Sequence, residues 1–241
     1  ALVRWQHPDN GPLMPGDFIG VAEDTSFIVN LGQWVLCEAV RQAADWVRQG
    51  QPCQVAVNVS ALQFQQTRFV EDVAAALKEH DLDPALLELE LTESILIQDA
   101  NEALERLRRL AGLGVALSID DFGTGYSSMA YLKRFPLHKL KIDRSFIMSL
   151  HEQELDAAIV LAIIQMGHAL KLEVVAEGVE LPEQLEQLQR LGCDQYQGFL
   201  YAPALPADGF FMRHEHGARL ANDARSRFGF GGERLVAAAR G

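Results

Sequence analysis

The stretch Val115-Ala116-Leu117-Ser118-Ile119-Asp120-Asp121 joins a short apolar run to two consecutive carboxylates, and Phe122-Gly123-Thr124-Gly125 follows it. An apolar run of this length is typical of a buried strand. Strand packing does not require the two carboxylates at its end, and the glycines favour a loop after them. This stretch therefore predicts a strand that carries acidic side chains to its carboxyl end.

Five other segments repeat this arrangement of a short apolar run with a polar residue at or near its end. The runs are residues 54–59, 86–91, 139–142, 173–176 and 195–200, and their polar residues are Asn58, Glu90, Lys141, Glu177 and Gln197. A seventh strand is expected at Leu2-Val3-Arg4. Between the runs, apolar residues recur at three- and four-residue spacing, which predicts helices over 31–48, 69–77, 101–113, 155–170 and 182–191. Alternating strands and helices indicate parallel α/β architecture, either a barrel or a doubly wound open sheet.

Composition excludes several classes of protein. The 241 residues are 49% hydrophobic and 22% charged, which is typical of a globular chain with room for one large domain. A net charge of −12 argues against binding of a DNA or RNA polymer, which needs a basic surface. A small phosphate ligand remains compatible with this charge if cations lie between the two.

The location also follows from composition. Cys37, Cys53 and Cys193 are widely separated and form no CxxC motif, which indicates reduced thiols and a cytoplasmic location. The apolar runs are too short to span a membrane and no secretory signal opens the chain, so this segment is expected to make no membrane contact.

Carboxyl ends of barrel strands converge on one rim, where active sites lie. We therefore expect Glu90, Asp120, Asp121 and Glu177 to meet; the alternative is that they form surface salt bridges, helix caps or, for Asp121, a turn. Four such carboxylates would repel one another unless cations were present. Oxygen ligands, with Asn58 and without histidine or cysteine, suit Mg²⁺ or Mn²⁺.

Of three further polar residues near these carboxylates, Lys141 and Glu93 each have more than one interpretation. Lys141 is a counter-charge for the acidic residues, or it orients a metal-bound water, or it neutralises a phosphate oxygen. Asp143 is expected to form an ion pair. Glu93 either hydrogen-bonds the backbone of the glycine-containing loop after Asp121 or caps the helix that follows it.

These motifs in this order resemble a known family, the EAL-domain cyclic-di-GMP phosphodiesterases. The matching motifs are Glu90-Leu91-Thr92-Glu93, Asp120-Asp121-Phe122-Gly123-Thr124-Gly125, Leu140-Lys141-Ile142-Asp143-Arg144-Ser145-Phe146, Ala176-Glu177-Gly178-Val179-Glu180 and Gln197-Gly198. The resemblance implies a modified TIM (β/α)8 barrel over residues 1–212 whose first strand is antiparallel. Residues 213–241 are expected to form a tail or a weak helix. The Glu of the family's Glu-Ala-Leu motif would immediately precede Ala1, so the resemblance predicts a barrel that is N-terminally incomplete.

The resemblance also implies roles for individual residues. Metal coordination is implied for Asn58, Glu90, Asp120 and Asp121, and Glu177 is implied as a general base or water-mediated ligand, with Lys141 and Gln197 near the water and the second metal. Substrate binding is implied for Arg4, Leu2 and Gln197, with Arg4 on a phosphate. Glu93 is implied to steady the loop, and Asp143 and Glu180 to have supporting roles. The implied cofactors are two divalent cations, Mg²⁺ or Mn²⁺, that share Asp120.

The implied activity is hydrolysis of cyclic di-GMP to linear pGpG by a metal-activated water. A non-catalytic cyclic-di-GMP receptor is the alternative if the Glu before Ala1 is absent, and a barrel enzyme for another phosphoester is a third hypothesis. The family further implies N-terminal sensor or GGDEF-type domains and a homodimer. We expect a cytoplasmic domain, either on its own or as the cytoplasmic part of a larger, membrane-anchored protein.

Overall fold

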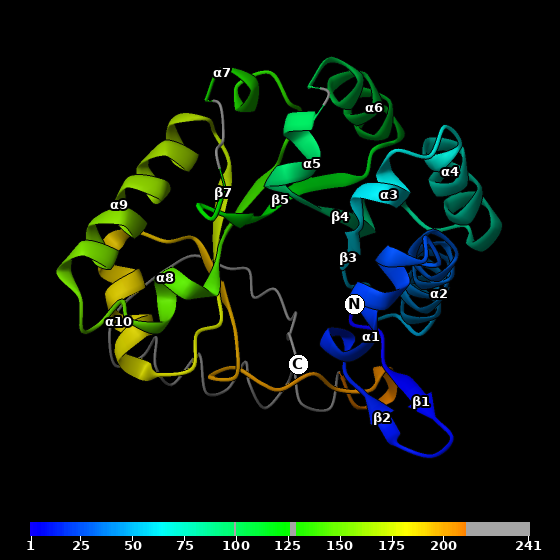
Figure 1. Ribbon diagram of the computed structural model, residues 1–241, viewed down its shortest axis with the longest axis horizontal. Coiled ribbons are helices and arrows are strands. Elements are labelled where there is room, and N and C mark those ends of the chain that lie inside the picture. The colour runs from blue at the N-terminus through cyan, green and yellow to red at the C-terminus, as the bar shows by residue number, and fades with distance from the viewer. Residues whose placement is uncertain (99, 126–128, 211–241) are drawn as a thin grey trace.

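Six parallel strands form a single sheet in a computed structural model that describes residues 1–98, 100–125 and 129–210. The strands are β3 (Val55–Val59), β4 (Leu87–Thr92), β5 (Ala116–Phe122), β6 (Lys139–Ile142), β7 (Glu173–Glu177) and β8 (Gln195–Gln197). Their order in space follows their order in the chain. A doubly wound sheet would reverse this order at a switch point, so the sheet winds as a barrel does. Figure 1 shows the sheet curled with helices around it, which confirms the predicted α/β, TIM-like class.

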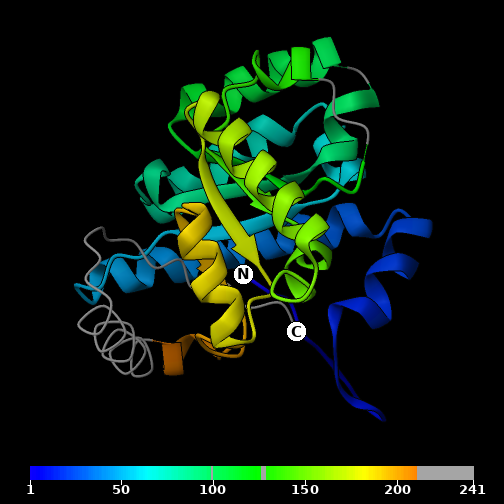
Figure 2. The same cartoon turned by 90° about the vertical axis from the view of Figure 1, so that its left-hand side faces the viewer.

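Helices connect the strands and cover the outside of the sheet. They are α1 (Pro15–Asp24), α2 (Ile28–Arg48), α3 (Ala61–Phe64), α4 (Phe69–His80), η1 (Pro84–Leu86), α5 (Glu93–Gln98), α6 (Ala100–Leu113), α7 (Met129–Leu132), α8 (Arg144–Met148), α9 (Glu154–Ala169) and α10 (Pro182–Leu191). Figure 2 looks onto α9 and α10 on the outside of the molecule. The five predicted helices are all present, and Pro182 opens α10 as expected.

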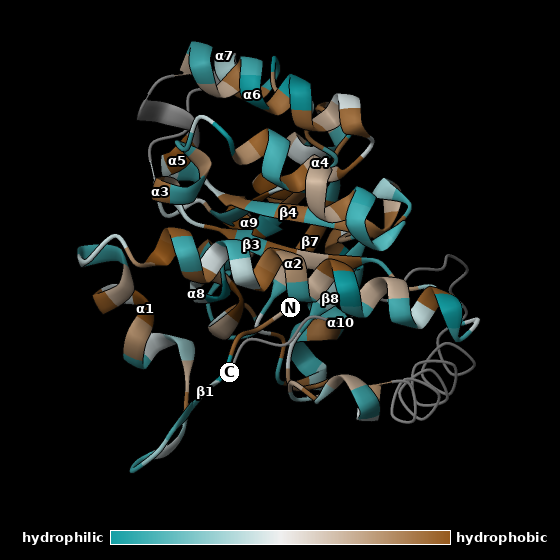
Figure 3. Cartoon of the chain, turned by 90° about the vertical axis from the view of Figure 1, so that its right-hand side faces the viewer, coloured by the Kyte–Doolittle hydropathy of each residue, from teal (hydrophilic) through white to brown (hydrophobic). Residues whose placement is uncertain are grey.

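The hydrophobic core lies between the sheet and these helices. On β4, Leu87, Leu89 and Leu91 are fully buried within it. Glu88 and Glu90 alternate with these leucines and therefore point to the opposite face, the interior of the barrel. Figure 3 shows hydrophobic colour on one side of helices such as α2 and hydrophilic colour on the other. The barrel interior is therefore available for polar side chains.

The prediction of a strand at Leu2-Val3-Arg4 is wrong. The first strand is β1 (Trp5–His7), which pairs antiparallel with β2 (Gly11–Leu13) in a separate two-stranded sheet. His7 Nδ1 accepts hydrogen bonds from the N–H groups of Asp9 and Asn10, which close the turn. Because β1 and β2 pair with each other, they add no strand to the six-stranded sheet.

The remaining predictions on the fold concern the last strand, the cysteines, the tail and membrane spans. The last predicted strand, 195–200, is shorter and ends at Gln197. The three cysteines are free thiols, and each is only partly buried. The predicted tail at 213–241 lies outside the described residues. In the part of the chain that the structure describes, no helix has the length and apolarity needed to cross a membrane.

Candidate functional site

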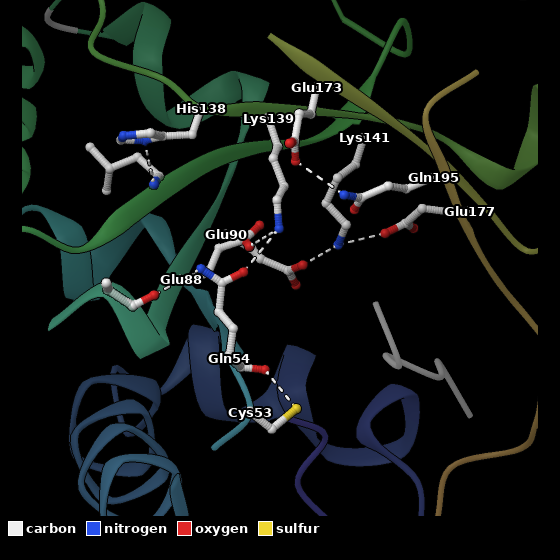
Figure 4. A network of polar contacts seen from close by, with 12 residues as sticks. Cys53, Gln54, Glu88, Glu90, His138, Lys139, Lys141, Glu173, Glu177 and Gln195 are labelled. Atoms are coloured by element: carbon white, nitrogen blue, oxygen red, sulfur yellow. Dashed lines mark hydrogen bonds and ion pairs between the residues drawn. The ribbon is translucent and has the colours of Figure 1, made fainter. Parts of the chain in front are cut away.

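Lys141 lies at the centre of a buried cluster of carboxylates. Its Nζ is 2.6 Å from Glu177 Oε1 and 3.3 Å from Asp120 Oδ1, and it also contacts Glu90 Oε1. The four side chains come from β6, β7, β5 and β4, and each is at most 5% exposed. Figure 4 shows Lys141 reaching between Glu90 and Glu177. The convergence predicted from the carboxyl ends of the strands is therefore observed for these residues.

The ion pairs keep Lys141 charged. Burial by itself lowers the pKa of the ammonium group, but the charges of Glu90, Glu177 and Asp120 outweigh burial and raise the pKa above its usual value. Lys141 therefore carries a positive charge at neutral pH and lies among the carboxylates of the cluster.

Asp120 and Asp121 reach the same site because β5 is irregular. Consecutive residues of a regular strand point to opposite faces, but the register between β5 and β6 shifts between Ile119 and Phe122. Asp121 has a φ of +54°, in the left-handed region, and its N–H donates to Asp120 Oδ1 at 3.0 Å. Carboxylate oxygens of Asp120, Asp121 and Glu177 then lie within 4.8 Å of one another.

The chemistry of this cluster fits a divalent cation. Its donors are carboxylate oxygens, which hard cations such as Mg²⁺ prefer, and no thiol or imidazole belongs to it. Glu90, Asp120, Asp121 and Glu177 carry four formal negative charges, and Lys141 carries one positive charge among them. Carboxylates this close to one another repel, so added cations would stabilise the arrangement.

Gln197 holds one member of the site in place, and Glu93 holds the loop that follows Asp121. Gln197 Nε2 donates to Glu177 Oε1 at 2.7 Å, and both side chains are buried. Glu93 Oε2 accepts from the Gly123 N–H at 3.4 Å, so the expected hydrogen bond to the loop backbone is present. A Cβ on Gly125 would lie 3.0 Å from the Glu93 carboxyl, so the loop passes directly over this side chain. Tyr126 to Ser128, the next part of the loop, lie outside the described residues.

Asn58 lies beside Glu90 in the sheet, because the two are register partners on β3 and β4, and its side chain is exposed. Glu180 is exposed as well. The side chain of Asp143 accepts hydrogen bonds from the Ser145 N–H at 2.9 Å and the Ser145 hydroxyl at 2.5 Å, so it caps α8.

Leu2 and Arg4 line a cavity of about 680 Å³ that α2, the start of β3 and residues 201–210 enclose. Arg4 Nη1 donates to the Val3 carbonyl at 2.9 Å. None of the carboxylates of the cluster lines this cavity.

Sequence reasoning missed a second polar layer inside the barrel. Lys139 Nζ lies 2.5 Å from Glu88 Oε2 and 3.1 Å from Gln54 Oε1 (Figure 4). The missed signal is a residue type repeated at a spacing of two, which places both copies on one face of a strand. The repeats are Glu88 and Glu90, Lys139 and Lys141, and Gln195 and Gln197.

The chain is similar to a known domain family and to several known proteins. The model of the EAL domain family matches residues 1–204. A Pseudomonas aeruginosa protein named bifunctional diguanylate cyclase/cyclic di-GMP phosphodiesterase MucR is 51% identical over 209 residues, which are 86% of this chain and 30% of that protein. The cyclic di-GMP phosphodiesterase NbdA of the same species is 47% identical over 207 residues, which are 86% of this chain and 26% of that protein.

A solved structure described as the PaMucR phosphodiesterase in complex with c-di-GMP has a TM-score of 0.85 and 50% identity. The match covers 87% of this chain and 85% of that one. The chain spans about a quarter to a third of the length of the curated relatives that it matches.

Proposed function

Because this chain belongs to the EAL domain family, we propose that it hydrolyses one phosphodiester bond of cyclic di-GMP and releases linear pGpG. The observation that carries the proposal is the cluster around Lys141, where Glu90, Asp120 and Glu177 contact one ammonium group inside a barrel. The names of MucR and NbdA and the c-di-GMP complex of PaMucR support the substrate.

Divalent cations, Mg²⁺ or Mn²⁺, belong to this proposal. Asn58, Glu90, Asp120 and Asp121 would hold these ions. When bound, such ions polarise a phosphoryl oxygen and make a water molecule more acidic.

Glu177 is the proposed general base, which takes the proton of the attacking water, or it is a ligand that acts through water. Gln197 Nε2 and Lys141 Nζ both contact Oε1 of this carboxylate, so its orientation is fixed before substrate arrives. A fixed orientation lowers the entropic cost of proton transfer.

Two cationic side chains have proposed roles toward the substrate and the water. Lys141 helps to place the attacking water beside Glu177, and its charge also suits a phosphate oxygen. Arg4, next to Leu2, binds a substrate phosphate through its forked guanidinium donors.

The test is turnover of cyclic di-GMP with Mg²⁺ or Mn²⁺, measured as pGpG released. It compares the 241-residue chain with a longer chain that carries Glu directly before Ala1. We expect metal-dependent turnover of cyclic di-GMP and a loss of at least about 100-fold for Glu177→Gln. Full activity of Glu177→Gln would refute the assignment of the base. Metal-independent binding of cyclic di-GMP without turnover in both chains would refute the enzyme and indicate a receptor.

A further inference from the structure

The short helix α8 lies between two backbone segments of the site. One follows Asp121 at the end of β5, and the other follows Glu177 at the end of β7. The helix begins shortly after Lys141 and β6, and the side chain of Asp143 caps its first turn. Ile147 is fully buried, and Gln184 Nε2 on α10 donates to the Met148 carbonyl at 3.3 Å. The helix is therefore anchored at both ends and packed in the middle, so its side chains present fixed surfaces to their neighbours.

One of these surfaces is the ring of Phe146, which lies against Gly123. A Cβ on Gly123 would be 2.8 Å and 3.2 Å from two ring carbons of Phe146, and 3.4 Å from Ile163 Cδ1 on α9. Gly123 also has a φ of +99°, a conformation that side chains disfavour. The backbone at this point therefore touches the aromatic ring directly, with no side chain between them.

Gly123 is two residues after Asp121, and the intervening backbone is constrained as well. The Gly123 N–H donates to Glu93 at 3.4 Å. The hydroxyl of Thr124 donates back to the Asp121 carbonyl at 2.9 Å. The segment that sets the direction of Asp121 is thus held by a hydrogen bond from Glu93 and by contact with Phe146.

A matching contact lies on the other side of α8. A Cβ on Gly178 would be 2.7 Å from Arg144 Cβ, and Gly178 has a φ of +70°. Gly178 directly follows Glu177. One helix therefore abuts the backbone next to two of the three carboxylates that could share a cation.

From these contacts we infer that Phe146 is a positioning residue for the acidic cluster. Its ring fixes the backbone at Gly123, and this keeps Asp121 in its left-handed conformation with its carboxylate beside Asp120. The inference rests on the proposed function in taking Asp120 and Asp121 as cation ligands. It does not depend on the identity of the substrate.

The test measures Mn²⁺ affinity of the free protein by electron paramagnetic resonance, without substrate. We expect Phe146→Ala to weaken Mn²⁺ binding by roughly tenfold or more, the range seen when groups behind metal ligands are removed. Phe146→Leu, which retains most of the contact, should recover a large part of the affinity. Because leucine leaves part of the ring contact with Gly123 empty, Phe146→Leu should still bind Mn²⁺ measurably more weakly than the wild type, which keeps the test usable if Phe146→Ala does not fold.

Phe69→Leu is the matched control, because this ring is 1% exposed on α4 and packs against Phe64 rather than the loop. It should lower the melting temperature but leave Mn²⁺ affinity unchanged. If folded Phe146→Ala and Phe146→Leu bind Mn²⁺ as the wild type does, the inference is wrong. It is equally wrong if Phe69→Leu weakens Mn²⁺ binding as much.

Hydrolysis assays on the same samples separate the two claims. A wild type that hydrolyses cyclic di-GMP while the Phe146 variants keep full Mn²⁺ affinity would overturn this inference alone. A wild type without hydrolysis, whose Mn²⁺ affinity still depends on Phe146, would overturn the proposed function and support this inference.

Discussion

Lys141 neutralises part of a site whose other charges repel one another. Its Nζ contacts three carboxylates, and all four side chains are buried. Removing one partner from a buried ion pair leaves the remaining charge without compensation, which costs about 3–5 kcal/mol. At this site, loss of the Lys141 ammonium would remove a positive charge from a group of carboxylates that already outnumber it.

We therefore predict that Lys141→Met lowers the free energy of unfolding by about 3–5 kcal/mol in the absence of divalent cations. Added Mg²⁺ should recover more of this stability in the variant than it adds to the wild type, because the ion replaces the missing charge. Urea denaturation with and without Mg²⁺ measures both effects.

Lys139→Met is the control for Lys141→Met, since Lys139 lies two residues earlier on the same strand and pairs with Glu88 in the second polar layer. It should also destabilise the protein, but Mg²⁺ should not recover the loss preferentially. Equal recovery in both variants would show that the ion does not bind beside Lys141.

The individual site residues were partly predictable. Glu90, Asp120 and Glu177 stand at the ends of short apolar runs, which is sufficient to place them at one rim. Asp121 was expected there from its neighbour, but only the register shift of β5 turns two consecutive side chains to one site. The shift belongs to the pairing of β5 with β6, and no pattern within β5 alone shows it.

Among the elements, α9 packs so closely on β7 that one position on it has no room for a side chain. A Cβ on Gly167 would be 2.5 Å from Val174 Cγ2. Val174 is on the strand that carries Glu177 at its end, so this helix and strand hold one wall of the site.

We predict that Gly167→Val destabilises the protein by about 1–3 kcal/mol, since overpacking forces the helix away from the strand. Gly112→Ala on α6 is the control. Nothing lies within 4 Å of a Cβ at Gly112, so the alanine should raise stability by up to about 1 kcal/mol through its helix propensity. Thermal denaturation measures both changes, and a Gly167→Val variant as stable as the wild type would contradict the close contact.

Elements with a strong apolar period were predictable, and those held by turns were not. The helix at 182–191 was expected with its proline at the start, and α10 has these bounds. The helix α1 was not expected, because Phe18 and Ala22 are its only residues classed as buried and they give little periodicity. The hairpin of β1 and β2 was missed because its three-residue strands carry no recognisable alternation.

At the scale of the whole molecule, strands that follow one another in the chain are neighbours in the sheet. This order brings the carboxyl ends of β4, β5, β6 and β7 side by side, so one rim collects Glu90, the two aspartates, Lys141 and Glu177. Alternation of strands and helices predicted the parallel class, the family motifs implied the barrel, and the strand order of the sheet agrees with a barrel. That order depends on long-range pairing, which local patterns do not encode.

Carboxylates from separate strands should bind divalent cations at this rim, and anomalous diffraction from crystals soaked in Mn²⁺ would locate the ions. We expect an anomalous peak about 2.1 Å from carboxylate oxygens of Asp120 and Asp121. Mn²⁺ found only at other surfaces, with Asp120 and Asp121 still bonded to protein groups alone, would contradict it.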